Sequence, residues 1–382
     1  MSILSLPALI RGRHIRDDYQ MPLTEWQARR KELCNLMEEK QLEGCLIYAD
    51  SLCNSYVEYF SNYNCVITWS NVMLLVLKDG RTVILCAVPG RDLERVKTFV
   101  CEDIEVELIG MSLVANDHVG SKVCEYISSH GLPQANWGAI NLDWSPAQTS
   151  SDLQALLGEL TDLTTDFDEM RLVKSKAEQS LISQASCLAR NGCISLARSC
   201  QKGGSVYEVA AKVNKELRCA GAEDVEILVG MNSNGGFLRV PDDTVFKTGD
   251  SIKVYVEVQY LRYKAVYGAT VTVGEEGINK AEECSKVMEI YKAIQKNCVA
   301  GKVFDFNAVL PDEWRGSTFT GIYSIGMDLK EPLFSEKGLS EGITISMVLE
   351  DPKTGAFLAD TMLVTQTGAQ SMTGAVHMME FM

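Results

Sequence analysis

The sequence predicts an α+β protein in which an N-terminal α/β domain precedes a domain with a curved antiparallel sheet. Three observations support this prediction. The chain has 382 residues, a length that favours two domains over one. Its first part alternates helical and strand patterns, as in a mixed sheet flanked by helices. Its second part follows the order helix, helix, strands and then helix, strands, which suggests a duplicated unit. We place the domains at 1–165 and 166–382.

The first domain is expected to begin with a helix that runs to about Glu39, with Thr24 and Gln27 as a capping box. A strand at 44–49 follows. The apolar runs VMLLVL and TVILCAV then flank the turn 78–80, which is typical of a hairpin. Further helix and strand candidates alternate at 90–100, 103–109, 119–130, 136–143 and 147–158.

The second domain is expected to open with two helices that carry complete capping signatures. Ser175 with Glu178 begins a helix to about Gln201, and Ser205 with Glu208 begins another to about Cys219. Gly203 and Gly204 end the first of these helices. Strand patterns follow at 225–231, 244–260 and 264–274, then a helix at 277–299, then strands at 342–351 and 356–365 around the turn 353–355.

Composition excludes several classes of protein. The 36 basic and 51 acidic residues give a net charge of −15, so neither a phosphate-backbone surface nor a nucleic-acid partner is expected. No apolar run approaches the ~18 residues of a membrane span. The start of the chain is a poor signal peptide because its apolar run breaks at Pro7. The 13 cysteines lack CxxC spacing, which favours buried thiols in a reducing cytoplasm over disulfides.

Histidine is scarce in this chain. Only four are present, and none lies between positions 131 and 376. Chemistry within that long stretch must therefore work without imidazole.

Several motifs resemble the pita-bread family, which comprises creatinase, prolidase and aminopeptidase P. They are EMRLVKSKAE at 169–178, GSVYEVA at 204–210, KTGDSIKV at 247–254 and DTMLVTQTG at 360–368, together with MPLTEWQARRKEL at 21–33. The resemblance covers nearly the whole chain. It implies a creatinase-like N-terminal domain, a pita-bread domain and, from the family's usual two-chain assembly, a homodimer.

The resemblance also implies that this chain lacks the catalytic groups of the family's peptidases. In the family's peptidases, two Asp, one His and two Glu hold two divalent metals. Carried over by position, these ligands fall at Tyr255, Val266, Tyr323, Val348 and Ala359. None of these side chains suits a hard divalent ion, so neither a dinuclear metallopeptidase nor any cofactor is expected.

Creatinase works without metal and uses two pocket histidines. These positions correspond to Leu238 and Lys330 in this chain, so the creatinase mechanism cannot be carried over either.

Strand periodicity indicates which polar groups remain near the lost metal site, because side chains two residues apart share a face. Glu257 shares the face of Tyr255, Lys264 that of Val266, and Glu350 that of Val348. Carboxylates beside a lysine in a cavity of low dielectric constant can serve as acid and base. We therefore expect four catalytic residues, Glu257, Lys330, Glu350 and Tyr323, and four substrate-binding residues, Tyr255, Lys264, Leu238 and Arg239.

Purely structural roles remain open for some of these residues. Glu257 and Lys264 could form a cross-strand pair on a solvated face. Tyr255 and Tyr323 would pack well in a vacated cavity.

Purely structural roles also remain open for the other charged candidates. Lys330 and Glu331 could be a solvated pair at a strand end. Glu350 could mark the end of a hairpin, or could itself stand at a ligand position if the alignment shifts by two residues.

Two functions follow from these expectations. The first is a metal-independent cytoplasmic enzyme that hydrolyses or otherwise cleaves a C–N bond in a small, polar, nitrogen-containing molecule. The second is a non-catalytic pita-bread protein that binds a ligand, a peptide or another protein. A water-accessible cavity lined by Glu257, Lys330 and Glu350 within hydrogen-bond reach of one another favours the enzyme. A cavity filled by Tyr255, Tyr323 and Val348 favours the binding protein.

Overall fold

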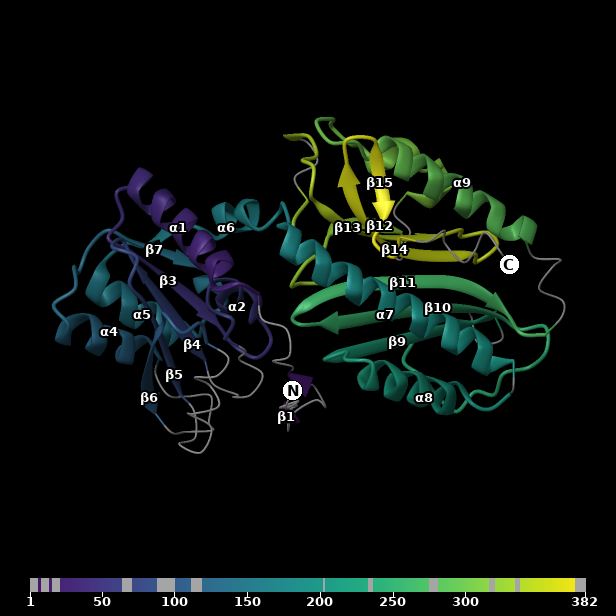
Figure 1. The fold of residues 1–382 in the computed structure, drawn as a ribbon, viewed down its shortest axis with the longest axis horizontal. Coiled ribbons are helices and arrows are strands. Elements are labelled where there is room, and N and C mark those ends of the chain that lie inside the picture. Colours follow the sequence, from purple (N-terminus) through teal and green to yellow (C-terminus); the bar gives the residue numbers. More distant parts are fainter. Residues whose placement is uncertain are drawn as a thin grey trace. The chain divides into compact units, whose positions relative to one another are not determined.

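The structure of the protein is a computed structural model, shown in Figure 1. It describes residues 6–7, 14–15, 21–63, 71–87, 100–110, 119–201, 203–232, 236–274, 281–315, 320–333 and 337–374. The chain divides into two compact units, one ending at Asp168 and the other consisting mainly of Glu169–Met382. Each unit has its own sheet and its own apolar core.

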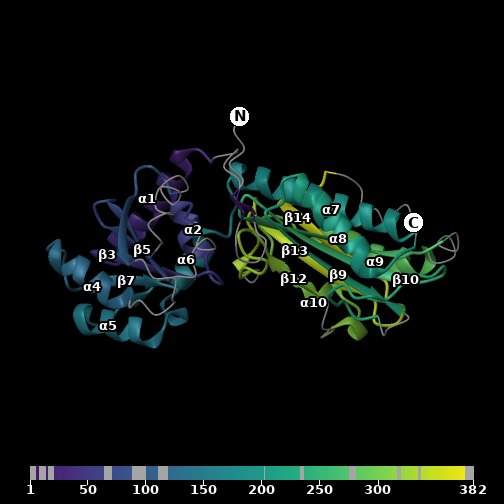
Figure 2. The ribbon, with the colours of Figure 1, turned by 90° about the horizontal axis from the view of Figure 1, so that it is seen from below.

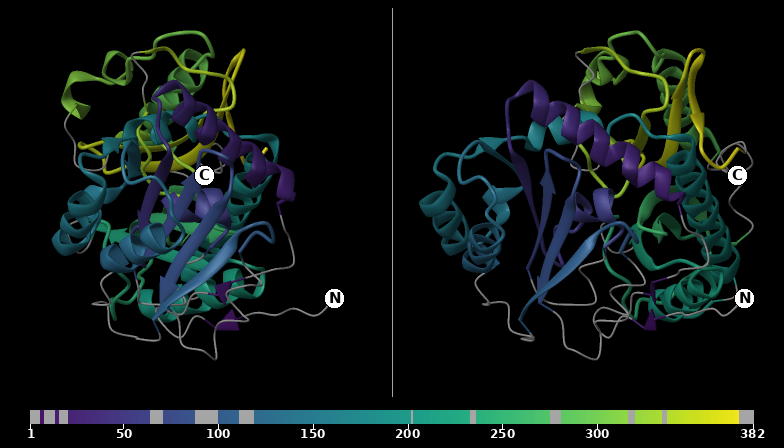
Figure 3. Two further views of the ribbon diagram at one scale, coloured as in Figure 1. Left: turned by 90° about the vertical axis from the view of Figure 1, so that its left-hand side faces the viewer. Right: turned by 60° about the vertical axis from the view of Figure 1, so that its left-hand side comes forward.

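The first unit contains a six-stranded mixed sheet of order β6-β5-β4-β3-β7-β8. Figure 3 shows this unit in purple and blue from two further sides. Every residue of β3, β4 and β5 is buried, so both faces of these strands are covered. The strands are β3 (Gly44–Ala49), β4 (Val72–Leu77), β5 (Thr82–Ala87), β6 (Glu105–Gly110), β7 (Trp137–Ile140) and β8 (Thr161–Asp162). The helices are α1 (Leu23–Glu39), α2 (Ser55–Ser61), α4 (Val119–Ser129), α5 (Ala147–Leu157) and α6 (Thr164–Met170), with a 3-10 turn at Leu142–Trp144.

The hairpin predicted in this unit is confirmed as β4 and β5, and the alternation of later elements is confirmed by β6, α4, β7 and α5. The predicted capping box at Thr24 is wrong. Helix α1 begins at Leu23 after Pro22, so Thr24 lies inside the first turn and no side chain caps the helix. Apart from Val100, the candidate element at 90–100 lies outside the described residues. Two short strands, β1 (Leu6–Pro7) and β2 (His14–Ile15), precede α1 along the chain.

The second unit contains a seven-stranded antiparallel sheet of order β12-β13-β14-β11-β10-β9, with β15 paired to β14. Its strands are β9 (Asp224–Met231), β10 (Ser251–Tyr260), β11 (Tyr263–Thr272), β12 (Gly321–Ser324), β13 (Thr344–Glu350), β14 (Phe357–Thr365) and β15 (Gly368–Ser371). Its helices are α7 (Lys176–Cys200), α8 (Val206–Cys219), α9 (Ala281–Asn297) and α10 (Phe306–Val309), with a 3-10 turn at Asp312–Trp314. The predicted antiparallel α+β domain is therefore confirmed.

Local signals in the second unit fix where its elements begin. Ser175 with Glu178 and Ser205 with Glu208 form the two predicted capping boxes. The strand expected at 244–260 is shorter than predicted, because the chain turns before Ser251. In that turn Asp250 accepts a hydrogen bond from the Lys247 amide, and Gly249 has a φ of 87°.

The helices α7 and α8 cover one face of this sheet, and the cavity described below opens on the other face. Figure 1 shows α7 lying across β10 and β11, and Figure 2 shows the same helix along one side of the curved sheet. Val254, Val256 and Val258 join the core beneath the helices. Because side chains alternate along a strand, Tyr255 and Glu257 point to the opposite face. In the part of the chain that the structure describes, no helix has both the length and the apolar character needed to span a membrane.

Candidate functional site

A cavity of about 240 Å³ opens on the face of the second unit's sheet that α7 does not cover. It brings side chains together from five strands and from the loop after β12. The residues that line it are Glu226, Leu228, Leu238, Tyr255, Glu257, Val266, Thr320, Gly321, Tyr323, Leu329, Lys330, Ser346 and Val348.

Strand register explains how distant segments meet at this cavity. Leu228 lies opposite Tyr255, which lies opposite Gly268. Gly268 in turn lies opposite Ala359, and Ala359 opposite Val348. Within this row of cross-strand neighbours, Leu228, Tyr255 and Val348 line the cavity, and together with Val266 they form its floor.

The floor is apolar. Tyr255, Val266 and Ala359 form one buried cluster with Ile325 and Phe357, and Val348 packs against it. These residues include four of the five positions at which the pita-bread resemblance places metal ligands. Among the described residues, no group of three or more His, Cys, Asp or Glu side chains is arranged to hold a metal ion.

The acidic side of the cavity is formed by β9 and β10. Glu226 and Glu257 are direct cross-strand partners, and Glu257 Oε1 lies 3.1 Å from Lys264 Nζ. Glu257 is only 8% exposed, so its carboxylate is not on a solvated face. Partial burial and the neighbouring charge of Glu257 raise the pKa of Glu226.

Tyr255 lies beside these two carboxylates. Burial, followed by the charges of Glu257 and Glu226, raises the pKa of the Tyr255 phenol well above its ordinary value. The phenol therefore stays protonated at neutral pH and offers a hydrogen-bond donor to the cavity.

The basic side of the cavity is formed by β12 and the loop after it. Lys330 Nζ lies 4.5 Å from the centroid of the Tyr323 ring, a distance at which the ammonium group is attracted to the ring face. Tyr323 is 39% exposed, and its ring lies close to Gly321, where a Cβ atom would come within 3.0 Å of it. Both side chains are thus at the mouth of the cavity rather than in its floor.

Five of the eight residues proposed from sequence line this cavity: Leu238, Tyr255, Glu257, Tyr323 and Lys330. Lys264 does not line it but reaches Glu257. Glu350 is also outside the lining and ends β13, where its carboxylate pairs with Lys253 Nζ at 2.6 Å. Arg239 is exposed and joins β9 through backbone hydrogen bonds to Val229.

Sequence reasoning missed Glu226, which is the direct neighbour of Glu257. Its strand was predicted, and Glu226 shares a face with Leu228. Only the register between β9 and β10 shows that this face meets Glu257.

Comparison with known proteins agrees with this geometry. Residues 29–173 match the model of the creatinase/prolidase N-terminal domain. Residues 180–366 match the model of metallopeptidase family M24. The chain thus combines a creatinase/prolidase N-terminal domain with an M24-family domain.

Individual relatives of this chain are distant. It is 26% identical to an Xaa-Pro dipeptidase of Pyrococcus horikoshii over 226 residues, which cover 54% of this chain and 63% of that relative. The match therefore spans less than two thirds of the relative's length.

Solved structures show the same fold over most of the chain. The prolidase from Pyrococcus horikoshii superposes with a TM-score of 0.71 at 19% identity, covering 92% of this chain and 99% of that one. The X-Pro aminopeptidase from Thermotoga maritima gives a TM-score of 0.76 at 17% identity, covering 91% and 98%. At these identities the likeness shows the fold alone.

Proposed function

We propose that the protein is a metal-independent enzyme that cleaves a C–N bond in a small, polar, nitrogen-containing molecule bound in the cavity of its M24 domain. One observation carries this proposal: Glu257, Tyr255, Tyr323 and Lys330 converge on a single cavity of about 240 Å³. A buried carboxylate on one side and an ammonium group on the other supply a base and an acid.

The proposed reaction is hydrolysis with Glu257 as the base. Glu257 takes a proton from a water molecule whose oxygen attacks the carbon of the C–N bond. Lys330 or Tyr323 then donates a proton to the departing nitrogen, and the carbon keeps the new oxygen. The Tyr255 phenol donates a hydrogen bond to the oxygen on which negative charge develops.

The residues at the five expected metal-ligand positions support metal independence. Val266, Val348 and Ala359, at three of the five expected ligand positions, carry no atom that can bind a metal. Tyr255, at a fourth, has a phenol whose pKa is raised well above its ordinary value, which opposes the deprotonation that metal binding needs. These residues do not fit the dinuclear centre of the M24 peptidases.

The test is a metabolite screen followed by turnover assays. A ligand that binds the folded state raises the melting temperature whether or not it reacts. Compounds that shift the melting temperature of the wild type are then assayed for product with the wild type and with Glu257→Gln. We expect product from the wild type and a loss of at least about 100-fold in kcat for the variant. Binding of several hits without product from any of them would contradict the enzymatic proposal.

A second function, ligand binding without catalysis, is favoured by two contacts. The Glu257 carboxylate already pairs with Lys264, and the Lys330 ammonium group already lies over the Tyr323 ring. In this case hits would raise the melting temperature, Glu257→Gln would weaken their binding, and none would be consumed.

A further inference from the structure

Lys330 and Tyr323 are carried by a loop whose opposite side is anchored in the protein interior. Ser324 and Glu331 close this loop as an isolated antiparallel bridge, in which the Glu331 amide donates to the Ser324 carbonyl oxygen at 2.8 Å. Because neighbouring residues point to opposite sides, Tyr323 and Lys330 point one way and Ser324 and Glu331 the other. The first two line the cavity, whereas Ser324 and Glu331 are buried.

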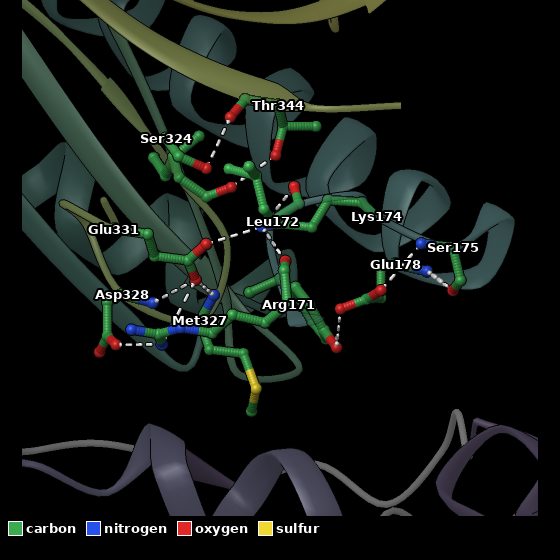
Figure 4. A network of polar contacts seen from close by, with 12 residues as sticks. Arg171, Leu172, Lys174, Ser175, Glu178, Ser324, Met327, Asp328, Glu331 and Thr344 are labelled. Atoms are coloured by element: carbon green, nitrogen blue, oxygen red, sulfur yellow. Dashed lines mark hydrogen bonds and ion pairs between the residues drawn. The ribbon is translucent and has the colours of Figure 1, made fainter. Parts of the chain in front are cut away.

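The Glu331 carboxylate is the centre of a buried polar network, which Figure 4 shows. Its Oε2 lies 2.6 Å from Lys174 Nζ. Its Oε1 accepts a hydrogen bond from the Met327 amide at 3.1 Å and lies 3.7 Å from Arg171 Nη1. A single carboxylate thus binds its own loop and the segment that precedes α7.

The other members of the network leave this carboxylate little freedom. Lys174 Nζ also donates to the carbonyl oxygens of Arg171, at 2.6 Å, and Leu172, at 3.2 Å. Arg171 Nη1 pairs with Asp328 at 2.6 Å. Lys174 and Glu331 are 3% and 4% exposed, so separation of either from its partner would leave a buried charge uncompensated.

The same loop also contacts the acidic side of the cavity. The Gly326 carbonyl oxygen accepts a hydrogen bond from the Lys264 amide at 2.7 Å, and the Lys264 side chain pairs with Glu257. A Cβ atom on Gly326 would lie 2.5 Å from Glu331 Oε1 and 2.7 Å from Lys174 Cε. A side chain at this position would therefore displace Glu331 or Lys174 within the network. The loop also links Lys330, Tyr323 and Lys264.

We propose that Glu331 is a positioning residue for the cavity, because its buried pair with Lys174 holds Lys330 over Tyr323. This inference rests on the proposed function, in which Lys330 or Tyr323 acts as the acid. Glu331 itself faces away from the cavity and touches no ligand.

The test uses a signal that needs no ligand. Lysines of the full-length protein are reductively methylated with ¹³C-formaldehyde, and Lys330→Arg identifies the Lys330 methyl resonance by its loss. In the wild type we expect this resonance upfield of the other lysines because of the Tyr323 ring, and Tyr323→Leu should abolish the displacement. Glu331→Gln and Gly326→Ala should abolish it as well. If Glu331→Gln and Gly326→Ala both fold and both keep the upfield displacement, the proposal is overturned.

Two further proteins separate positioning from general stability. Glu223→Gln alters another buried carboxylate of this domain, which pairs with Arg262 Nη1 at 3.2 Å, and should leave the displacement intact. If Glu331→Gln does not fold, the Lys174→Met/Glu331→Gln protein removes both buried charges together, which buried pairs often tolerate. We expect that protein to fold and to lack the displacement, and its retention there would overturn the proposal.

Failure of this inference and failure of the proposed function can be told apart. A screen that finds no substrate counts against the proposed function, while the methyl resonance still tests Glu331. If a substrate is found, Glu331→Gln should lower kcat on the order of 100-fold with a small change in KM, whereas Glu223→Gln should not. Equal kcat values for these two variants would overturn the positioning role.

Discussion

Glu257 and Lys264 form an ion pair of 3.1 Å across the β10–β11 hairpin, although the register places Glu257 opposite Val266 and Lys264 opposite Gln259. The pair is therefore diagonal, within reach of a long lysine side chain. This ion pair offsets repulsion at the cavity, because the cross-strand neighbour of Glu257 on β9 is a second carboxylate, Glu226. Lys264 is thus the nearby cation that offsets two adjacent carboxylates at the cavity.

Removal of this cation should destabilise the second domain. Lys264→Met leaves Glu257, which is largely buried, beside Glu226 without its ion-pair partner. We expect the free energy of unfolding in urea at neutral pH to fall by about 1–3 kcal/mol. The Lys264→Met/Glu257→Gln protein should recover part of this loss. Strict additivity of the two single changes would contradict a direct interaction.

A metal ligand restored to the cavity floor should not create a metal site. Val266 is 1% exposed within the apolar cluster, so Val266→Asp buries a carboxyl group among Tyr255, Phe357 and Ala359. We expect a loss of at least about 2 kcal/mol in the free energy of unfolding. Val266→Asn serves as the uncharged control. Excess MnCl₂ should not restore the stability of Val266→Asp, and metal-dependent recovery would show that enough ligands remain.

Asp360 should make stability depend on pH. Burial raises its pKa to about 7, although Tyr291 and Ser371 donate hydrogen bonds to it. In the unfolded chain this carboxyl ionises near 3.8. Its stabilising contribution is therefore complete below about pH 4 and is lost as the pH rises through 7.

Asp360→Asn tests this contribution because asparagine does not titrate. The stability difference, wild type minus variant, should fall by on the order of 4 kcal/mol between pH 4 and pH 7.5, as measured by urea unfolding. A difference that stays constant across this range would show that Asp360 has an ordinary pKa in the folded protein.

Thiol reactivity should follow burial. Burial raises the pKa of Cys193 to about 12 and that of Cys200 to about 11, whereas Cys187 and Cys219 are exposed. In the native protein we expect a disulfide reagent to label Cys187 and Cys219 rapidly, because the thiolate is the reactive form. Peptide mass mapping identifies the labelled sites, and labelling in urea provides the control. Equal rates for Cys193 and Cys187 in the folded state would contradict the burial argument.

Local sequence signals predicted much of the fold. The capping boxes at Ser175 and Ser205 involve residues three apart, so their chemistry can be read without tertiary information. The capping box at Thr24 failed because the helix starts two residues earlier, with Pro22 at the N-cap position. The order of helix and strand patterns in the second half predicted the curved antiparallel sheet, and the family motifs agreed with it.

The candidate site was only partly predictable, because it depends on register and on loop contacts. Alternation placed Glu257 on the face of Tyr255 correctly, but it could not show Glu226 beside it. Alternation also placed Glu350 on the face of Val348, yet the Glu350 carboxylate pairs with Lys253 away from the cavity lining. The partner of Glu331 lies 157 residues away in the sequence, at Lys174, and no local pattern indicates it.

Turnover by metal-depleted protein decides whether the cavity works without a metal ion. The wild type is stripped with a chelator, its metal content is measured by mass spectrometry, and each compound that raised its melting temperature is assayed for C–N cleavage. We expect product formation at an unchanged rate without divalent metal and a collapse of that rate in Glu257→Gln. Activity that disappears on chelation and returns with Mn²⁺ or Zn²⁺, with two ions bound per chain, would contradict it.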